Sequence, residues 1–105
     1  MKVVKIAMLL VLAVIFASGI VSAAQQGASI EKGKAFFNDP QLGTNGKTCN
    51  SCHPNGKGLE RSGSKPDLVD TINGCITIPL KGKALDPKSV QMESLVLYIK
   101  SLGSK

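Results

Sequence analysis

The chain of 105 residues carries 13 Lys and Arg against 7 Asp and Glu, which gives a formal net charge of +6. Hydrophobic residues make up 43% of the chain, but aromatic residues only 4%, and there is no Trp. One small domain is therefore the upper limit, and these figures exclude a multidomain enzyme, a repeat array and a multi-pass membrane protein.

The first 24 residues have the pattern of a secretory signal peptide. Two lysines precede an apolar stretch at residues 6–17, and small residues follow up to Ala24. Cleavage after Ala23 or Ala24 leaves residues 25–105 as one exported domain with a net charge of +4 and no membrane span. The alternative is an uncut anchor, because the apolar and small residues together approach the ~20 that cross a bilayer.

The first predicted helix covers residues 30–37. Ser29 is a suitable N-cap, and the sequence Asn38-Asp39-Pro40 ends the helix. Gly33 lies inside it, where a glycine costs about 1 kcal/mol relative to Ala. We therefore expect another backbone to approach this helix closely at Gly33.

The middle of the chain shows little regular periodicity. Residues 41–65 are rich in Gly, Asn, Ser and Lys, so we expect loops that something else must hold in place. A short helix is predicted to begin around Pro66 and to end at Asn73-Gly74. A short apolar segment at residues 75–80 and a polar loop at residues 81–88 follow.

The last predicted helix is the clearest. Ser89 is its N-cap, and apolar residues recur at helical spacing up to Leu102. Tyr98 flanks this stripe and is expected to reach the first helix. The sequence therefore predicts an all-α fold of three or more short helices with long loops.

Cys49-Asn50-Ser51-Cys52-His53 is a C-x-x-C-H motif, the attachment signature of c-type haem. The two thiols would bond to the haem as thioethers, and His53 would bind the iron as the proximal ligand. A rigid macrocycle bonded at two points would also give the loops at residues 41–65 an apolar surface to pack against.

The same cysteines are also compatible with other chemistry. A disulfide, a thioredoxin-type redox pair and a zinc site formed with Cys75 and His53 are the alternatives. The redox pair requires a βαβ context that is absent from the sequence. In the zinc site, the adjacent Cys52 and His53 would have to point at one ion. The predicted export of the chain also favours haem attachment, because bacterial c-type haem is attached outside the cytoplasm.

The sequence resembles the monohaem class I c-type cytochromes over residues 29–102. The similarity rests on Gly33 to Phe37, on the C-x-x-C-H motif and on the closing helix at residues 92–99. This resemblance implies a small cytochrome c-like fold wrapped around one covalent haem c. It also implies that the first and last helices cross near Gly33, Phe37 and Tyr98.

The sixth ligand of the iron is left open, mainly between two sulfur atoms, with a Lys side chain, water or an open site as the remaining alternatives. The common Met-Pro position before the last helix here holds Ile78-Pro79. Residues 72–75 and the segments after them resemble the haem domains of thiosulfate dehydrogenases and Sox-type sulfur-oxidation cytochromes, in which the matching Cys is an axial thiolate. Cys75 is therefore the expected ligand, and Met92 is the alternative, although a Met at such spacing usually belongs to a core.

These features predict a periplasmic electron carrier rather than an enzyme. Its partners would be redox proteins, some of them acidic because of the lysines, and nucleic acid is not expected with so small a charge and so few aromatic residues. The alternative is a haem subunit or enzyme of thiosulfate oxidation with a His/Cys-ligated haem. The sequence leaves open the reduction potential, the identity of the partners and the oligomeric state.

Overall fold

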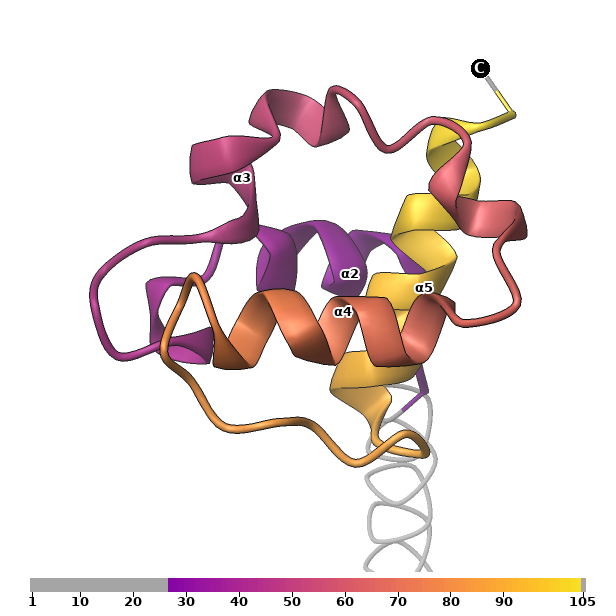
Figure 1. The fold of residues 1–105 in the computed structure, drawn as a ribbon. Coiled ribbons are helices and arrows are strands. Elements are labelled where there is room, and N and C mark those ends of the chain that lie inside the picture. The colour runs from indigo at the N-terminus through magenta and orange to yellow at the C-terminus, as the bar shows by residue number, and fades with distance from the viewer. Residues whose placement is uncertain (1–26, 105) are drawn as a thin grey trace, which may run out of the picture.

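The computed structural model describes residues 27–104, and the predicted signal peptide at residues 1–24 lies outside them. The described part is helical and contains no strand, which confirms the all-α class. Figure 1 shows the arrangement of its elements. In chain order these are α2 (Ile30–Phe37), η1 (Pro40–Leu42), α3 (Cys49–Cys52), η2 (Pro54–Gly56), η3 (Ser62–Ser64), α4 (Leu68–Thr77) and α5 (Val90–Leu102).

Helices α2 and α5 form the main helix pair. A Cβ atom at Gly33 would overlap the backbone carbonyl of Ser94, so the two helices approach as closely as the absence of a side chain permits. Next to this crossing, the rings of Phe37 and Tyr98 pack at a centroid distance of 5.1 Å. The backbone N–H of Ser29 donates to the buried Ser94 hydroxyl at 3.2 Å. The predicted close approach at Gly33 and the contact of Tyr98 with the first helix are both confirmed.

Helix α4 is longer than predicted. It continues through Asn73 and Gly74 to Thr77, so the predicted end at Asn73-Gly74 is wrong, and the first part of the apolar segment at residues 75–80 is helical. The Asn73 side chain does not cap the helix but bonds both backbone groups of Leu85, at 2.8 and 2.9 Å. Pro79, which disfavours helical geometry in the residue before it, follows the true end.

The loop after η1 is tied to the chain that leaves α4. The Thr44 N–H donates to the Leu80 carbonyl at 2.9 Å, and the Asn45 amide donates to the Pro79 carbonyl at 2.8 Å. Gly43 lies so close to Leu80 that a Cβ atom would overlap it. These bonds replace the regular structure that the sequence at residues 41–47 lacks.

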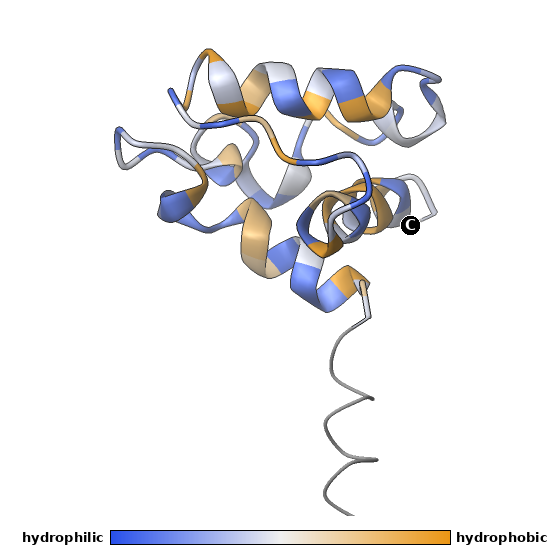
Figure 2. Cartoon of the chain, turned by 90° about the horizontal axis from the view of Figure 1, so that it is seen from below, coloured by the Kyte–Doolittle hydropathy of each residue, from blue (hydrophilic) through white to orange (hydrophobic). Residues whose placement is uncertain are grey.

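The core lies between α2, α4 and α5, and Figure 2 shows hydrophobic bands along these helices. Most helices are short, so few residues of each reach the core. No helix within residues 27–104 has the length and apolar character needed to cross a membrane. The buried core residues are Phe37, Leu68, Ile72, Ile76, Met92, Leu95, Tyr98, Ile99 and Leu102.

Candidate functional site

The C-x-x-C-H motif forms a single helical turn, α3, followed directly by His53. Thr48 is its N-cap: the Thr48 hydroxyl accepts from the Ser51 N–H at 3.2 Å, and the Ser51 hydroxyl accepts from the Thr48 N–H at 2.9 Å. Residues three and four positions apart lie on one face of a helix. The turn therefore brings Cys49, Cys52 and His53 to the same side, and the His53 N–H donates to the Cys49 carbonyl at 3.0 Å.

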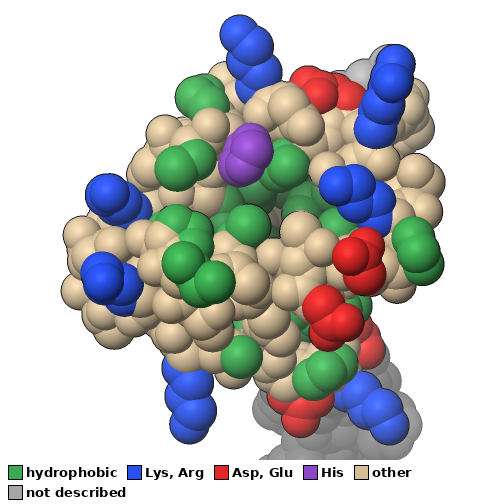
Figure 3. Space-filling model, viewed as in Figure 1, with side chains coloured by type: hydrophobic (Ala, Val, Ile, Leu, Met, Phe, Trp, Pro, Cys, Tyr) green, Lys and Arg blue, Asp and Glu red, His purple; other side chains and the backbone are tan. Residues whose placement is uncertain are grey.

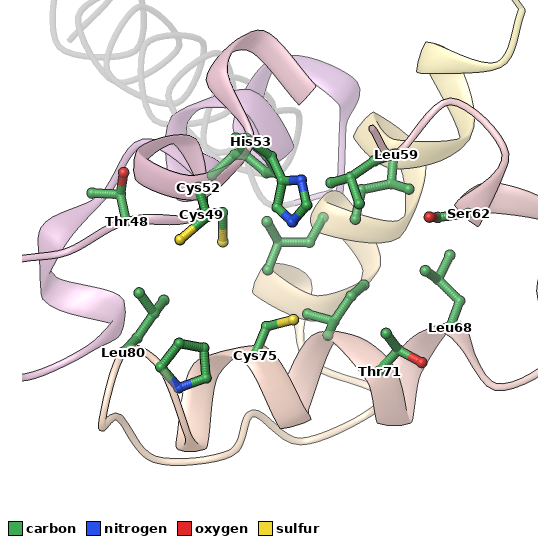
Figure 4. Close-up of a pocket in the computed structure, with 15 residues that line it drawn as sticks. Thr48, Cys49, Cys52, His53, Leu59, Ser62, Leu68, Thr71, Cys75 and Leu80 are labelled. Atoms are coloured by element: carbon green, nitrogen blue, oxygen red, sulfur yellow. The ribbon is translucent and has the colours of Figure 1, made fainter. Parts of the chain in front are cut away.

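An apolar cavity of about 250 Å³ opens beside this turn. Figure 4 shows α3 on one side of it and α4 on the other, and residues of α5 also contribute to its wall. Figure 3 shows apolar side chains around the single histidine, with Lys and Arg side chains around them. The residues that line it are Phe37, Thr48, Cys49, Cys52, His53, Leu59, Ser62, Leu68, Thr71, Ile72, Cys75, Pro79, Leu80, Leu95 and Ile99.

The His53 ring has a fixed tautomer. Its Nδ1 lies 3.0 Å from the backbone carbonyl oxygen of Lys57. Because a carbonyl can only accept, Nδ1 carries the proton of this bond, and in the neutral ring Nε2 keeps its lone pair. Figure 4 shows the ring directed toward the cavity, so the imidazole presents an electron pair to the cavity, as a metal-ligating histidine does.

The loop after His53 is shaped by left-handed backbone conformations. Asn55 has φ 53°, and Gly56 and Gly58 have φ 80° and 92°. The Asn50 side chain accepts from the Asn55 N–H at 2.8 Å. Because a Cβ atom at Gly56 would overlap the Leu102 side chain, the loop packs tightly on the end of α5.

Cys75 projects from α4 across the cavity. Figure 4 shows its sulfur directed into the cavity on the side opposite His53. Burial, together with the neighbouring Cys75, raises the pKa of the Cys49 thiol to about 11. The three cysteines are unpaired, and the structure brings all of them to one cavity together with His53.

Met92, the alternative sixth ligand, lies elsewhere. It is fully buried in the core, and it is absent from the cavity lining, to which α5 contributes Leu95 and Ile99. Of the two sulfur atoms left open by the sequence, the one on the cavity surface therefore belongs to Cys75.

Several parts of the site were not foreseen from the sequence. The role of the Lys57 carbonyl cannot be predicted from the sequence, because every residue has a backbone carbonyl. The cavity-lining residues of α5 were predicted only as core. The α3 turn had one usable signal, namely that Thr48 and Ser51 stand at the positions of a capping box.

The cavity-lining cysteines and histidine do not converge as the ligands of a bare metal ion would. No group of three His, Cys, Asp or Glu side chains in the described part of the chain has an arrangement that would bind a metal ion. A zinc site would require Cys49, Cys52, Cys75 and His53 to converge on one point, whereas here they line the wall of an apolar cavity.

No protein-family model matches this chain, and neither a curated protein nor a solved structure matches it.

Proposed function

We propose that this chain is a monohaem c-type cytochrome with a cytochrome c-like fold that carries single electrons between redox partners outside the cytosol. One observation supports this most strongly. Cys49, Cys52 and His53 share one face of a capped turn beside an apolar cavity, and His53 Nδ1 is bonded to the Lys57 carbonyl. In this proposal the two sulfurs attach one haem c, and His53 Nε2 binds its iron.

The bound haem would supply a one-electron couple between ferric and ferrous iron. The protein side chains would determine its environment. Apolar residues such as Leu59, Leu68 and Ile72 would exclude water from the macrocycle. The cavity opens at the protein surface, where a partner that donates or accepts the electron could approach the edge of the haem.

Positive charge near this opening favours acidic partners. Lys47 and Lys57 are exposed in the segments on either side of the motif, and exposed Lys81 follows the cavity residue Leu80. Clustered positive charge speeds the encounter with a negatively charged surface at low salt. The predicted signal peptide at residues 1–24 supports a periplasmic location, where such partners would be met.

Haem attachment tests this function directly. The full chain is expressed in a host that exports and matures c-type cytochromes, with the double variant Cys49→Ser/Cys52→Ser as control. We expect the wild type to exceed its amino-acid mass by one haem, to show a Soret band and to titrate as a one-electron couple. A wild type with the mass of the bare polypeptide and no Soret band would overturn the proposal.

The position of Cys75 favours a second candidate function. With a thiolate opposite His53, the chain would be the haem subunit of a thiosulfate-oxidising enzyme. Joining two thiosulfate ions through a new S–S bond releases two electrons, and one haem accepts only one at a time. A further haem or an electron-accepting partner is therefore part of this candidate.

The sixth ligand is tested by substitution in the haem-loaded protein. If Cys75 is the ligand, Cys75→Ala changes the ferric optical and EPR spectra, and Thr71→Ala, which alters the same cavity wall one turn earlier, leaves the ligand signals in place. If Met92→Leu changes the spectra and Cys75→Ala does not, Met92 is the ligand. Thiosulfate oxidation by the purified chain with a dye acceptor would favour the second candidate over the carrier.

A further inference from the structure

Glu60 stands at the end of a hydrogen-bonded chain that leads to His53. Its two carboxylate oxygens accept from the Gly58 N–H at 3.2 and 3.0 Å. That N–H belongs to the peptide group between Lys57 and Gly58. The carbonyl of the same peptide group accepts from His53 Nδ1 at 3.0 Å. A single planar peptide thus connects a carboxylate to the imidazole.

The orientation of this peptide is fixed by the surrounding chain. Gly58 has φ 92°, a conformation that residues with side chains rarely adopt. Gly56 is buried against Leu102, and the Glu60 carbonyl lies against Gly103 just beyond the end of α5. Packing on α5 therefore holds both ends of the segment at residues 56–60, and the connecting peptide cannot turn freely.

The carboxylate is charged under ordinary conditions. Hydrogen bonds from the backbone N–H groups of Glu60 itself and of Gly58 lower the pKa of the Glu60 carboxyl, and the positive charge of Lys57 lowers it further. At neutral pH the Gly58 N–H accordingly donates to an anion. Hydrogen bonds with an ionised partner are about twice as strong as neutral ones.

A peptide that donates to a carboxylate becomes a better acceptor at its carbonyl oxygen. Hydrogen bonds in a chain polarise one another, by perhaps ~10–30% per bond. A stronger acceptor at Lys57 draws the His53 Nδ1 proton outward and makes Nε2 a more basic ligand. More basic ligands favour ferric over ferrous iron, and hydrogen bonding of this kind is one way in which a protein tunes a haem.

We propose that Glu60 is a positioning residue that acts through the Lys57–Gly58 peptide to orient His53 and lower the reduction potential of the bound haem. The inference rests on the proposed function, since it takes His53 as the iron ligand. It adds an exposed glutamate, seven residues beyond the motif, to the groups that determine the potential.

The test compares haem-loaded wild type with Glu60→Gln, Glu60→Ala and a control, Glu93→Gln. The control removes an equal charge from an exposed position in the first turn of α5. Each protein is titrated for its midpoint potential. The only histidine of the chain is labelled with ¹⁵N, and its Nδ1–H resonance and solvent exchange are followed by NMR in the reduced state.

We expect the potential to rise in Glu60→Gln and to rise further in Glu60→Ala. In the same order the Nδ1–H resonance should move upfield and exchange faster, whereas Glu93→Gln should leave that resonance unchanged. The inference is overturned if the Glu60 variants shift the potential no more than Glu93→Gln, or if they shift it with an unchanged Nδ1–H resonance, which would assign the effect to charge alone. Failure of the proposed function is a separate outcome, because the wild type would then carry no haem.

Discussion

Two helical glycines of this chain occupy opposite environments. Gly33 faces the backbone of α5, and a methyl group there would overlap the Ser94 carbonyl. Relief of that overlap requires α2 and α5 to separate, because the obstacle is backbone rather than a flexible side chain. Overpacking of this kind costs about 1–3 kcal/mol or more. Thermal or urea unfolding of haem-loaded Gly33→Ala should therefore show a loss of at least ~2 kcal/mol.

Gly74 provides the matched control for this substitution. It lies inside α4, and nothing comes within 4 Å of a Cβ atom built there. Since Ala is preferred over Gly in a helix interior by about 0.5–1 kcal/mol, Gly74→Ala should leave stability unchanged or raise it. Equal destabilisation by the two variants would contradict the close contact of α2 with α5 at Gly33.

The Glu60 carboxylate makes the stability of the loop at residues 56–60 depend on pH. Because its pKa is lowered in the folded protein, it contributes stability that is present above the ordinary Glu pKa of about 4.3 and is lost as the pH falls through the lowered folded value. Lys57 and His53 are the charged or titratable groups that act on it.

Melting temperatures of haem-loaded wild type and Glu60→Gln, measured across a range of pH, should check the direction of this pH dependence. The excess stability of the wild type should be constant above about pH 5 and should shrink as the solution becomes more acidic. A difference that grows toward low pH would show that the carboxylate is not stabilised by the fold.

At the scale of elements, α4 shows where local signals fail. Asn-Gly is a common helix end because Asn caps and Gly adopts positive φ. Neither happens here: Gly74 keeps a helical conformation, and Asn73 bonds Leu85 twelve residues later. The bonds of Asn73 are tertiary, so they are invisible to any reading of neighbouring residues. The spacing of Leu68, Ile72 and Ile76 carried the correct signal, since all three are buried.

The link between Asn73 and Leu85 connects α4 to the loop that leads to α5. Asn73→Ala would leave a partly buried N–H and carbonyl without partners, at a cost of about 1–3 kcal/mol for each unsatisfied group. Denaturant unfolding should show this loss. The control is Asn38→Ala, which removes one exposed local bond to Lys34 and should cost less. Similar losses in the two variants would contradict a special role for the Asn73 link.

The candidate site divides between what the motif contains and what the fold adds. Cys49, Cys52 and His53 were identified from their spacing, because a short helical turn brings such neighbours to one face whatever the rest of the chain does. The opposite wall depends on how α4 packs, so only the structure separates Cys75 on the cavity surface from Met92 in the core. The chain from His53 to Glu60 passes through a backbone peptide, which has no residue signature.

At the scale of the whole molecule, the haem would complete the core. The buried residues come mostly from α2, α4 and α5, whereas the segment from η1 to η3 contributes few. A domain of this size buries a modest share of its surface and is only marginally stable without an additional constraint. A macrocycle joined to α3 at two sulfurs and filling the cavity would bind that segment to α4 and α5. Loss of the haem should therefore affect residues 41–65 more than the crossing of α2 and α5.

The double variant Cys49→Ser/Cys52→Ser tests this directly. Without attachment, the apolar cavity wall is exposed to water, so we expect the cooperative thermal transition to weaken or disappear. Hydrogen exchange followed by mass spectrometry should rise most in residues 41–65 and least where α2 crosses α5, because the Gly33–Ser94 contact does not involve the cavity. Thr71→Ala, which changes the cavity wall but leaves both attachment sulfurs in place, is the control. A double variant that melts like the wild type and keeps its protection in residues 41–65 would show that these loops fold without the haem.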